Sequence, residues 1–151
     1  MSDLLYFEDF PVGETVTFGA YQVTAEEIKT YATEFDPQPF HLDEYAASLS
    51  IGGALSASGW HTLAMSMRMM FDAYVGRAAS LGSFGVDEVK WLKPVFAGDI
   101  LTCRRTTLDA RVSASRPEMG LITFHWLVSD QHGQAKLDMR GNGLLKVRGQ
   151  S

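Results

Sequence analysis

The sequence contains a single cysteine, Cys103, which excludes an intramolecular disulfide. It has no run of lysine and arginine, and its formal net charge of -5 argues against nucleic-acid binding, which needs a basic surface. No apolar stretch is long enough to span a bilayer. The first eleven residues are acidic and end in Pro11, unlike a signal peptide. We therefore predict a cytoplasmic protein with neither a membrane nor a nucleic acid as partner.

What the sequence does contain is enough apolar material for one packed domain. With 151 residues, of which 46% are hydrophobic, we expect a single domain spanning 1–151. Cys103 falls within an alternating strand pattern, so we expect it to be a small buried side chain rather than a nucleophile.

The first half of the chain predicts helices after one short strand at 15–21. Thr24 and Glu27 form a capping box pattern, and the helix that follows should end near Phe35, because the residue before Pro37 avoids the helical region. A second, short helix is expected from Asp43. The longest helix should begin at Ser58-Gly59 and run through WHTLAMSMRMMFDAY. Its apolar residues cover nearly the whole circumference, which indicates burial on most sides, with its methionines in the core. A secondary expectation is that some of these methionines line an acyl tunnel beside the helix.

The second half predicts strands separated by turns. β-branched and aromatic residues are concentrated at 86–92, 99–109, 119–130 and 134–148, and the last two segments should form a hairpin. Glycines in Gly141-Asn142-Gly143 suggest a bulge in the final strand. One strand, a set of helices and four successive strands predict an α+β domain with an antiparallel β-sheet wrapped around one long buried α-helix, the hot-dog fold.

The segment Asp36-Pro-Gln-Pro-Phe-His41 resembles the signature of the MaoC-like dehydratases and (R)-specific enoyl-CoA hydratases. The resemblance continues to Ser58-Gly59 and to the segment KPVFAGD at 93–99, and covers most of the chain. Gln38 stands where the family often has asparagine, and many members have His-Gly in place of Ser58-Gly59. These departures retain the Asp36–His41 pair and leave the substrate open.

The resemblance implies a hydratase or dehydratase that acts on a 2-enoyl or 3-hydroxyacyl thioester. It implies that Asp36 and His41 share the catalytic water and that the Gly59 N–H, at a helix N-terminus, polarises the thioester carbonyl. Fully extended, the steps from Asp36 to His41 would span about 15 Å, so this segment must fold back. The residues expected to contact substrate are Ser58, Trp60, Gln38 and Pro39.

No cofactor beyond the thioester carrier, CoA or acyl-carrier protein, is expected, and no cluster of side chains has the spacing of a metal site. We expect a basic side chain to hold the carrier phosphate, and the candidates are Lys90, Lys93, Arg104, Arg105 and Arg111. His61 could line the pocket or pack in the core. A sheet around one helix leaves strand edges and one helix flank uncovered, so we predict at least a homodimer.

Two alternatives stay open at this point. A hot-dog thioesterase would need a carboxylate on or near the long helix, which offers none from Trp60 to Phe71, with Asp72 near its end. The other alternative is a non-catalytic subunit that binds acyl thioesters, against which the intact Asp36 and His41 argue. The fold alone does not decide among these functions.

Overall fold

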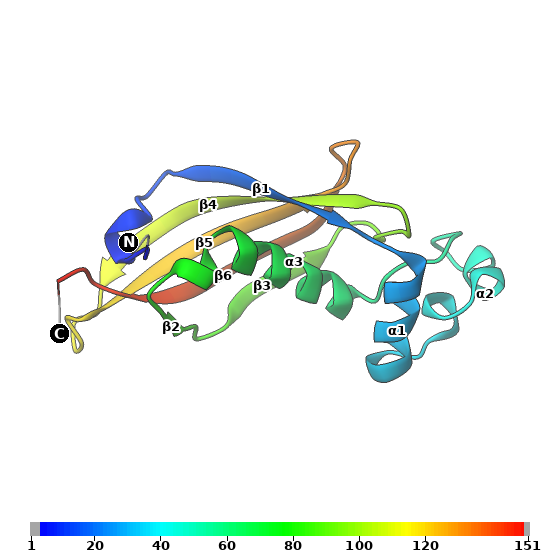
Figure 1. Cartoon of the computed structure of the whole chain (residues 1–151), viewed down its shortest axis with the longest axis horizontal. Coiled ribbons are helices and arrows are strands. Elements are labelled where there is room, and N and C mark those ends of the chain that lie inside the picture. The colour runs from blue at the N-terminus through cyan, green and yellow to red at the C-terminus, as the bar shows by residue number, and fades with distance from the viewer. Residues whose placement is uncertain (1–3, 150–151) are drawn as a thin grey trace.

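The computed structural model describes residues 4–149 and contains one antiparallel β-sheet with one long helix against it (Figure 1). The α-helices are α1 (Ala25–Phe35), α2 (Glu44–Ser48) and α3 (Gly59–Ala73), and short 3-10 helices span Phe7–Asp9, Pro39–His41 and Val75–Arg77. The strands are β1 (Thr15–Gln22), β2 (Ser80–Gly82), β3 (Val86–Trp91), β4 (Ile100–Val112), β5 (Met119–Ser129) and β6 (Ala135–Lys146). The predicted α+β class is confirmed. Among residues 4–149 no helix has the length and apolar character needed to cross a membrane.

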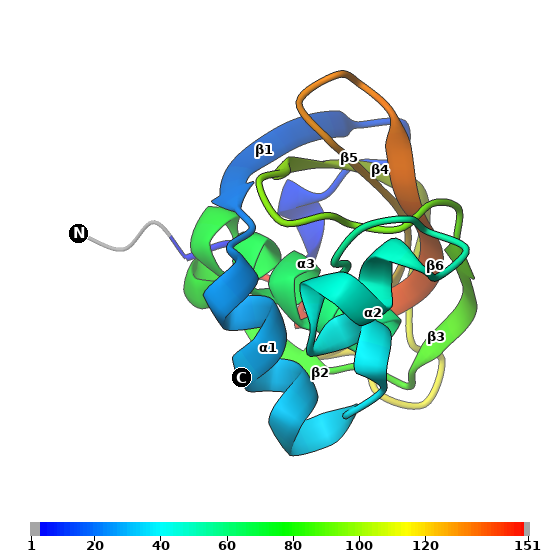
Figure 2. The ribbon, with the colours of Figure 1, turned by 90° about the vertical axis from the view of Figure 1, so that its right-hand side faces the viewer.

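The sheet curves around α3 instead of lying flat beside it. Its strands follow the order β1-β4-β5-β6-β2, and β3 also pairs with β6. Seen from one end, the strands form an arc around α3, with α1 and α2 close together at the end of the molecule nearest the viewer (Figure 2). Along β5 every second residue is buried, which is the pattern of a sheet with one face on the core. The concave face of the sheet therefore forms one wall of the core and α3 forms the other.

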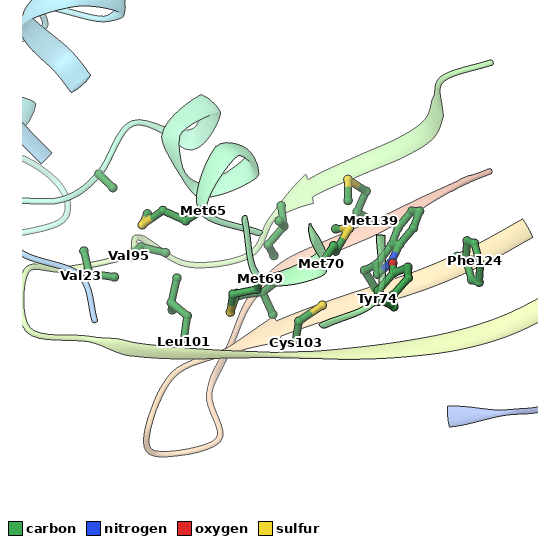
Figure 3. Packing of buried hydrophobic residues seen from close by; sticks show 14 of the residues in the cluster. Val23, Met65, Met69, Met70, Tyr74, Val95, Leu101, Cys103, Phe124 and Met139 are labelled. Atoms are coloured by element: carbon green, nitrogen blue, oxygen red, sulfur yellow. The ribbon is translucent and has the colours of Figure 1, made fainter. Parts of the chain in front are cut away.

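The side of α3 that faces the sheet is rich in methionine. Met65, Met69 and Met70 are buried, and they lie between the helix and the strand residues Leu101 and Cys103 (Figure 3). Burying a side chain of this size contributes about 1.5–3 kcal/mol. The flexible thioether also fills irregular gaps between a straight helix and a curved sheet. The expected core positions of these methionines and of Cys103 are confirmed.

The opposite side of α3 is left at the surface. Trp60, Met67 and Phe71 are 64%, 46% and 48% exposed and follow one another at helical spacing, so they form a single apolar stripe. The expectation that α3 is buried on most sides is therefore wrong for this flank. Along the free edge next to the stripe, β3 pairs only with β6 within residues 4–149. Both features match the uncovered flank and strand edge that motivated the homodimer prediction.

Local sequence signals place the ends of α1 correctly. Thr24 Oγ1 accepts a hydrogen bond from the Glu27 N–H at 3.1 Å, and the helix ends at Phe35, as Pro37 predicts. The second half of the capping box is wrong. The Glu27 carboxylate does not reach back to Thr24, because it accepts a hydrogen bond of 2.6 Å from the Tyr21 hydroxyl.

The strand predictions fail in two details. The glycines of Gly141-Asn142-Gly143 form no bulge against β5, since β6 keeps a regular register there, and the irregularity lies instead in β3 between Val86 and Glu88. A Cβ on Gly141 would lie 3.0 Å from Val86 Cγ1, so the glycine allows the two strands to approach closely. Strand β2 was not predicted, because three residues are too few to show an alternating pattern.

Candidate active site

The chain reverses direction between Asp36 and His41. Asp36 follows the last residue of α1, and its N–H donates to the Ala32 carbonyl at 2.9 Å. Gln38 closes the turn with two bonds to Asp36: its backbone N–H donates to the carbonyl at 2.8 Å, and its side-chain amide donates to Oδ1 at 2.7 Å. The 3-10 helix Pro39–His41 then returns the imidazole, whose Nε2 lies 3.5 Å from Asp36 Oδ2. The predicted fold-back of this segment is confirmed.

A backbone carbonyl fixes the proton position on His41. Nδ1 lies 2.6 Å from the Ser56 carbonyl oxygen, and because a carbonyl only accepts, Nδ1 must carry the hydrogen. In neutral His41 the lone pair is then on Nε2, which points toward Asp36. The ionised carboxylate is also only an acceptor. Two acceptors 3.5 Å apart cannot bond to each other, but a water molecule that donates to both would satisfy them.

The Ser58 hydroxyl makes the largest contribution to holding the pKa of Asp36 below its ordinary value of 3.8. Burial opposes this effect, and the Gln38 amide and the charge of His41 support it. Ser58 occupies the N-cap position of α3 but caps the helix with no side-chain bond, so its fully buried hydroxyl serves Asp36 instead. The contact falls short of a full hydrogen bond. Asp36 is therefore charged at neutral pH.

Gly59 begins α3 directly beneath the indole of Trp91. The Trp91 Nε1–H donates to the Gly59 carbonyl at 2.9 Å, and a Cβ on Gly59 would lie only 2.6 Å from that nitrogen. Any larger residue here would have to displace the indole or the start of the helix. An N–H in the first turn of a helix has no partner within the helix, and the helix dipole favours negative charge there. The Gly59 N–H can therefore serve a developing oxyanion.

These groups meet at an open cavity of about 420 Å³ at the N-terminal end of α3. The cavity is lined by most of the predicted site residues: Asp36, Gln38, His41, Gly59 and Trp60. Two predicted substrate contacts, Ser58 and Pro39, are not part of the lining: Ser58 is fully buried beside Asp36, and Pro39 begins the 3-10 turn. The facing wall is formed by Trp91, Leu92, Lys93, Pro94 and Val95. Of this wall, sequence reasoning proposed only Lys93, although the segment 93–99 was already visible as part of the resemblance.

His61 packs in the protein instead of lining the cavity. Its ring stacks on Tyr31 with centroids 4.4 Å apart, and its Nε2 lies 3.4 Å from Glu27 Oε1. Burial lowers the pKa of His61, against the opposing effect of Glu27. A neutral His61 thus joins α1 to the first turn of α3, and the packing alternative for this residue holds.

A second cavity, of about 540 Å³, lies beside the C-terminal half of α3. Its lining is almost entirely apolar and includes Met67 and Met70 from the helix and Met139 from β6. This matches the secondary expectation that some methionines line an acyl tunnel next to the helix. None of the residues that line this cavity also lines the one at Gly59.

The basic candidates for a phosphate site differ in their position in the structure. Lys93 lines the cavity, and Lys90, Arg104 and Arg111 lie at the surface. Arg105 is buried, where it pairs with Glu14 at 2.6 Å. Its guanidinium also stacks over aromatic rings of the core: Phe10, Tyr74 and Phe124. Arg105 is therefore wrong as a phosphate candidate, since its charge is committed inside the protein.

The carboxylate that a thioesterase would need on α3 is absent from the cavity. Asp72 is near the end of the helix, where it pairs with Arg68 at 3.1 Å on the surface. This arrangement gives no support to the thioesterase alternative.

Comparison with known proteins supplies the family. The model of the MaoC-like domain matches residues 9–120. The chain belongs to the MaoC-like domain family. It is 28% identical over 116 residues to the uncharacterised protein YdeM of Bacillus subtilis, covering 77% of this chain and 81% of that protein.

Solved structures agree with this assignment. A MaoC-like dehydratase from Rhodospirillum rubrum superposes with a TM-score of 0.90 at 36% identity, covering 97% of this chain and 99% of that one. The R-hydratase PhaJ1 from Pseudomonas aeruginosa has the same fold, with a TM-score of 0.73 at 16% identity and coverage of 97% and 92%. The Mycobacterium tuberculosis protein Rv0216, described as a double hot-dog fold, matches at TM-score 0.83 and 14% identity, covering 97% of this chain and 45% of that one. The hot-dog fold predicted from sequence is confirmed.

Proposed function

We propose that this MaoC-like protein is a hydro-lyase that reversibly adds water to a 2-enoyl thioester to form a 3-hydroxyacyl thioester. The observation that carries the proposal is the pair of acceptors, Asp36 Oδ2 and His41 Nε2, 3.5 Å apart in the wall of a cavity. Its similarity to a MaoC-like dehydratase across 97% of the chain supports the same reaction class.

The two acceptors have different roles toward one water molecule. The His41 Nε2 lone pair takes a proton as the water oxygen bonds to the β-carbon, while Asp36 accepts a hydrogen bond from the second hydrogen and orients the water. The electron pair of the double bond moves toward the thioester oxygen, and the proton is then delivered to the α-carbon. Dehydration follows the same steps in reverse. The bond from Nδ1 to Ser56 keeps Nε2 free to accept.

The negative charge on the thioester oxygen needs a fixed donor. The Gly59 N–H at the start of α3 supplies it, with the helix dipole adding to the stabilisation. Removing a single donor of this type usually costs about 10²–10³-fold in rate. Trp60 and Gln38 complete the substrate wall in this proposal, and the buried Ser58 supports Asp36 behind it.

The substrate is carried on CoA or an acyl-carrier protein, whose phosphates are anionic. Among the basic candidates Lys93 is the one that lines the cavity, so we assign it to the carrier phosphate. Replacing Lys93 with glutamate should raise KM. Added salt should reduce the difference in KM between the variant and the wild type, because it screens the charge at position 93.

The test is the initial rate of 2-enoyl-CoA hydration in Asp36→Asn, His41→Ala and the double variant, with thermal unfolding measured alongside. Each single change should reduce turnover by about 10²–10⁴-fold while the protein stays folded. Because both groups act on one water, the double variant should be little worse than either single one. A panel of acyl lengths and branches gives the preferred substrate.

The chain offers a matched control in a second His–Asp pair. His125 Nε2 lies 2.8 Å from Asp138 Oδ1 on neighbouring strands β5 and β6, outside the cavity lining. His125→Ala and Asp138→Asn should leave turnover per folded molecule unchanged. Near wild-type turnover in a folded Asp36→Asn or His41→Ala variant would remove the basis of the proposed mechanism.

A further inference from the structure

The proposed chemistry gives no role to Lys136, a buried cation. Lys136, near the start of β6, is only 2% exposed. Its ammonium donates to the Pro94 carbonyl at 2.8 Å and lies 3.4 Å from Asp99 Oδ2 and 3.6 Å from Asp130 Oδ2. The Phe96 ring centroid is 5.0 Å away. Three acceptors match the three donors of an ammonium group, which is the condition for keeping a lysine charged away from water.

The two carboxylates are themselves held in place by backbone groups. Asp99 Oδ2 accepts from the Phe96 N–H at 2.9 Å. Asp130 Oδ1 accepts from two N–H groups of the turn 132–134, each at 2.9 Å. Both carboxylates are therefore oriented independently of Lys136, and the ammonium has one defined place between them. Such a network fixes geometry more than it adds stability, because desolvating the charges is costly.

Lys136 holds the far wall of the candidate site from two directions. Its side chain binds the Pro94 carbonyl, and its own carbonyl accepts from the N–H groups of Leu92 and Lys93, at 2.8 and 3.4 Å. The residues thus anchored line the cavity opposite Asp36. The wall between β3 and β4 belongs to no strand, and Lys136 binds it at three backbone groups, the Pro94 carbonyl and the N–H groups of Leu92 and Lys93.

The anchored wall continues to the carbonyl that orients His41. The Ala57 N–H donates to the Val95 carbonyl at 2.8 Å, and Ser56 forms a β-bridge with Phe96. The Ser56 carbonyl in turn accepts from His41 Nδ1 at 2.6 Å. A continuous set of contacts therefore runs from the ammonium to the imidazole, through segments far apart in the sequence.

We propose that Lys136 is a positioning residue for His41, acting through the 94–97 wall and the Ser56 carbonyl. The inference rests on the proposed function for its kinetic consequence, but its structural consequence is independent of it. If the ammonium is lost, Pro94 and its neighbours shift, Ser56 follows, and His41 Nδ1 loses its fixed acceptor. Nε2 then no longer faces Asp36 as a defined acceptor.

The experiment compares Lys136→Met, which keeps most of the length of the side chain and removes the ammonium, with the wild-type protein. The first readout is the tautomer of His41, taken from its imidazole ¹⁵N shifts at a pH where the ring is neutral and assigned with His41→Ala. The second readout is kcat and KM on a 2-enoyl-CoA. We expect the Nδ1–H tautomer to give way to a mixture, and kcat to fall about 10–100-fold with KM nearly unchanged.

A matched control separates this effect from general loss of stability. Arg105→Met removes another buried cation, one paired with Glu14 at 2.6 Å and packed on core aromatic rings outside the lining of the cavity at Gly59. It should lower the melting temperature and leave the His41 tautomer and kcat unchanged.

A folded Lys136→Met variant with the wild-type tautomer of His41 would overturn the proposal, whatever the activity shows. If the wild-type chain hydrates no enoyl thioester, the proposed function fails, yet a tautomer change in Lys136→Met still supports the positioning role. If Lys136→Met does not fold, Lys136→Met combined with Asp99→Asn and Asp130→Asn takes its place, since it also removes the ammonium but leaves no unpaired buried carboxylate. An unaltered His41 tautomer in this folded variant would then overturn the proposal.

Discussion

Replacing Gly59 with alanine separates the geometry of the helix N-terminus from the stability of the fold. The new Cβ would lie 2.6 Å from Trp91 Nε1 and 2.7 Å from Cε2, distances that unstrained structures do not contain. Either the indole moves or the start of α3 moves. In both cases the bond of 2.9 Å from Trp91 to the Gly59 carbonyl is lost or distorted.

The two consequences differ greatly in size. Losing one hydrogen bond at a residue 46% exposed costs about 0.5–1.5 kcal/mol, and alanine returns about 0.5–1 kcal/mol because it restricts the unfolded chain. The net change should therefore shift the melting temperature by only about 2–4 °C. A displaced oxyanion donor, in contrast, costs about 10²–10³-fold in kcat. Gly59→Ala should thus be folded and nearly inactive.

The assay follows loss of the conjugated thioester absorbance of a 2-enoyl-CoA, with thermal unfolding on the same samples. Adding Trp91→Leu to Gly59→Ala removes the clash and should recover part of kcat, whereas a methyl group that blocks substrate directly would allow no recovery. Gly120→Ala is the control, because its Cβ would collide with Phe7 outside the cavity lining. It should lower stability and spare turnover. Wild-type kcat in folded Gly59→Ala would refute the assignment of this amide.

Three further expectations follow from individual contacts. Ser58→Ala should raise the pKa of Asp36, followed directly through the carboxyl ¹³C shift of Asp36 against pH, and an unchanged titration of this carboxyl would contradict the role of the hydroxyl. Burial opposes ionisation of Asp130, but backbone hydrogen bonds and Lys136 outweigh it and hold its pKa below 3.8. The stability contributed by the charged form is therefore complete above that value and is lost as pH falls through the lowered pKa. The melting temperature should drop in that range in the wild type and less in Asp130→Asn. If the β3 strands of two copies pair antiparallel about residue 89, Glu88 of one copy faces Lys90 of the other. Glu88→Lys should then weaken the dimer, measured by sedimentation, by about 0.2–1 kcal/mol per pair. Adding Lys90→Glu should restore the dimer.

Much of the fold was predictable because its signals are local. Pro37 acts on its immediate neighbour and Thr24 on the first turn, so α1 begins and ends where the sequence says. β2 was not predicted, because Ser80–Gly82 carries no local pattern and forms a strand only by pairing with β6. The exposed flank of α3 was predicted as buried because apolar composition does not say how many partners a helix has.

The site was predictable where it follows one motif and unpredictable where distant segments meet. Asp36 and His41 lie within six residues and come together through a turn. Trp91 contacts Gly59 because β3 lies in the sheet beside the start of α3, and no periodicity near either residue encodes that contact. Arg105 is a different kind of error, because a signal was present. Leu101, Cys103 and Arg105 lie at alternate positions of β4 and therefore on the same face, so alternation already placed the guanidinium on the buried face.

The cavity shares two residues, Trp60 and Trp91, with the uncovered surface of the molecule. Trp60 lines the cavity and also begins the exposed stripe of α3 that continues to Met67 and Phe71. Trp91 lines the same cavity and ends β3, whose outer edge pairs with no strand within residues 4–149. A second copy docked on this stripe and edge would therefore cover the open side of the cavity. Excluding water there strengthens the interactions of Asp36 and of the Gly59 amide with substrate, because both are electrostatic. On this reasoning pairing between two chains and closure of the proposed active site are a single event.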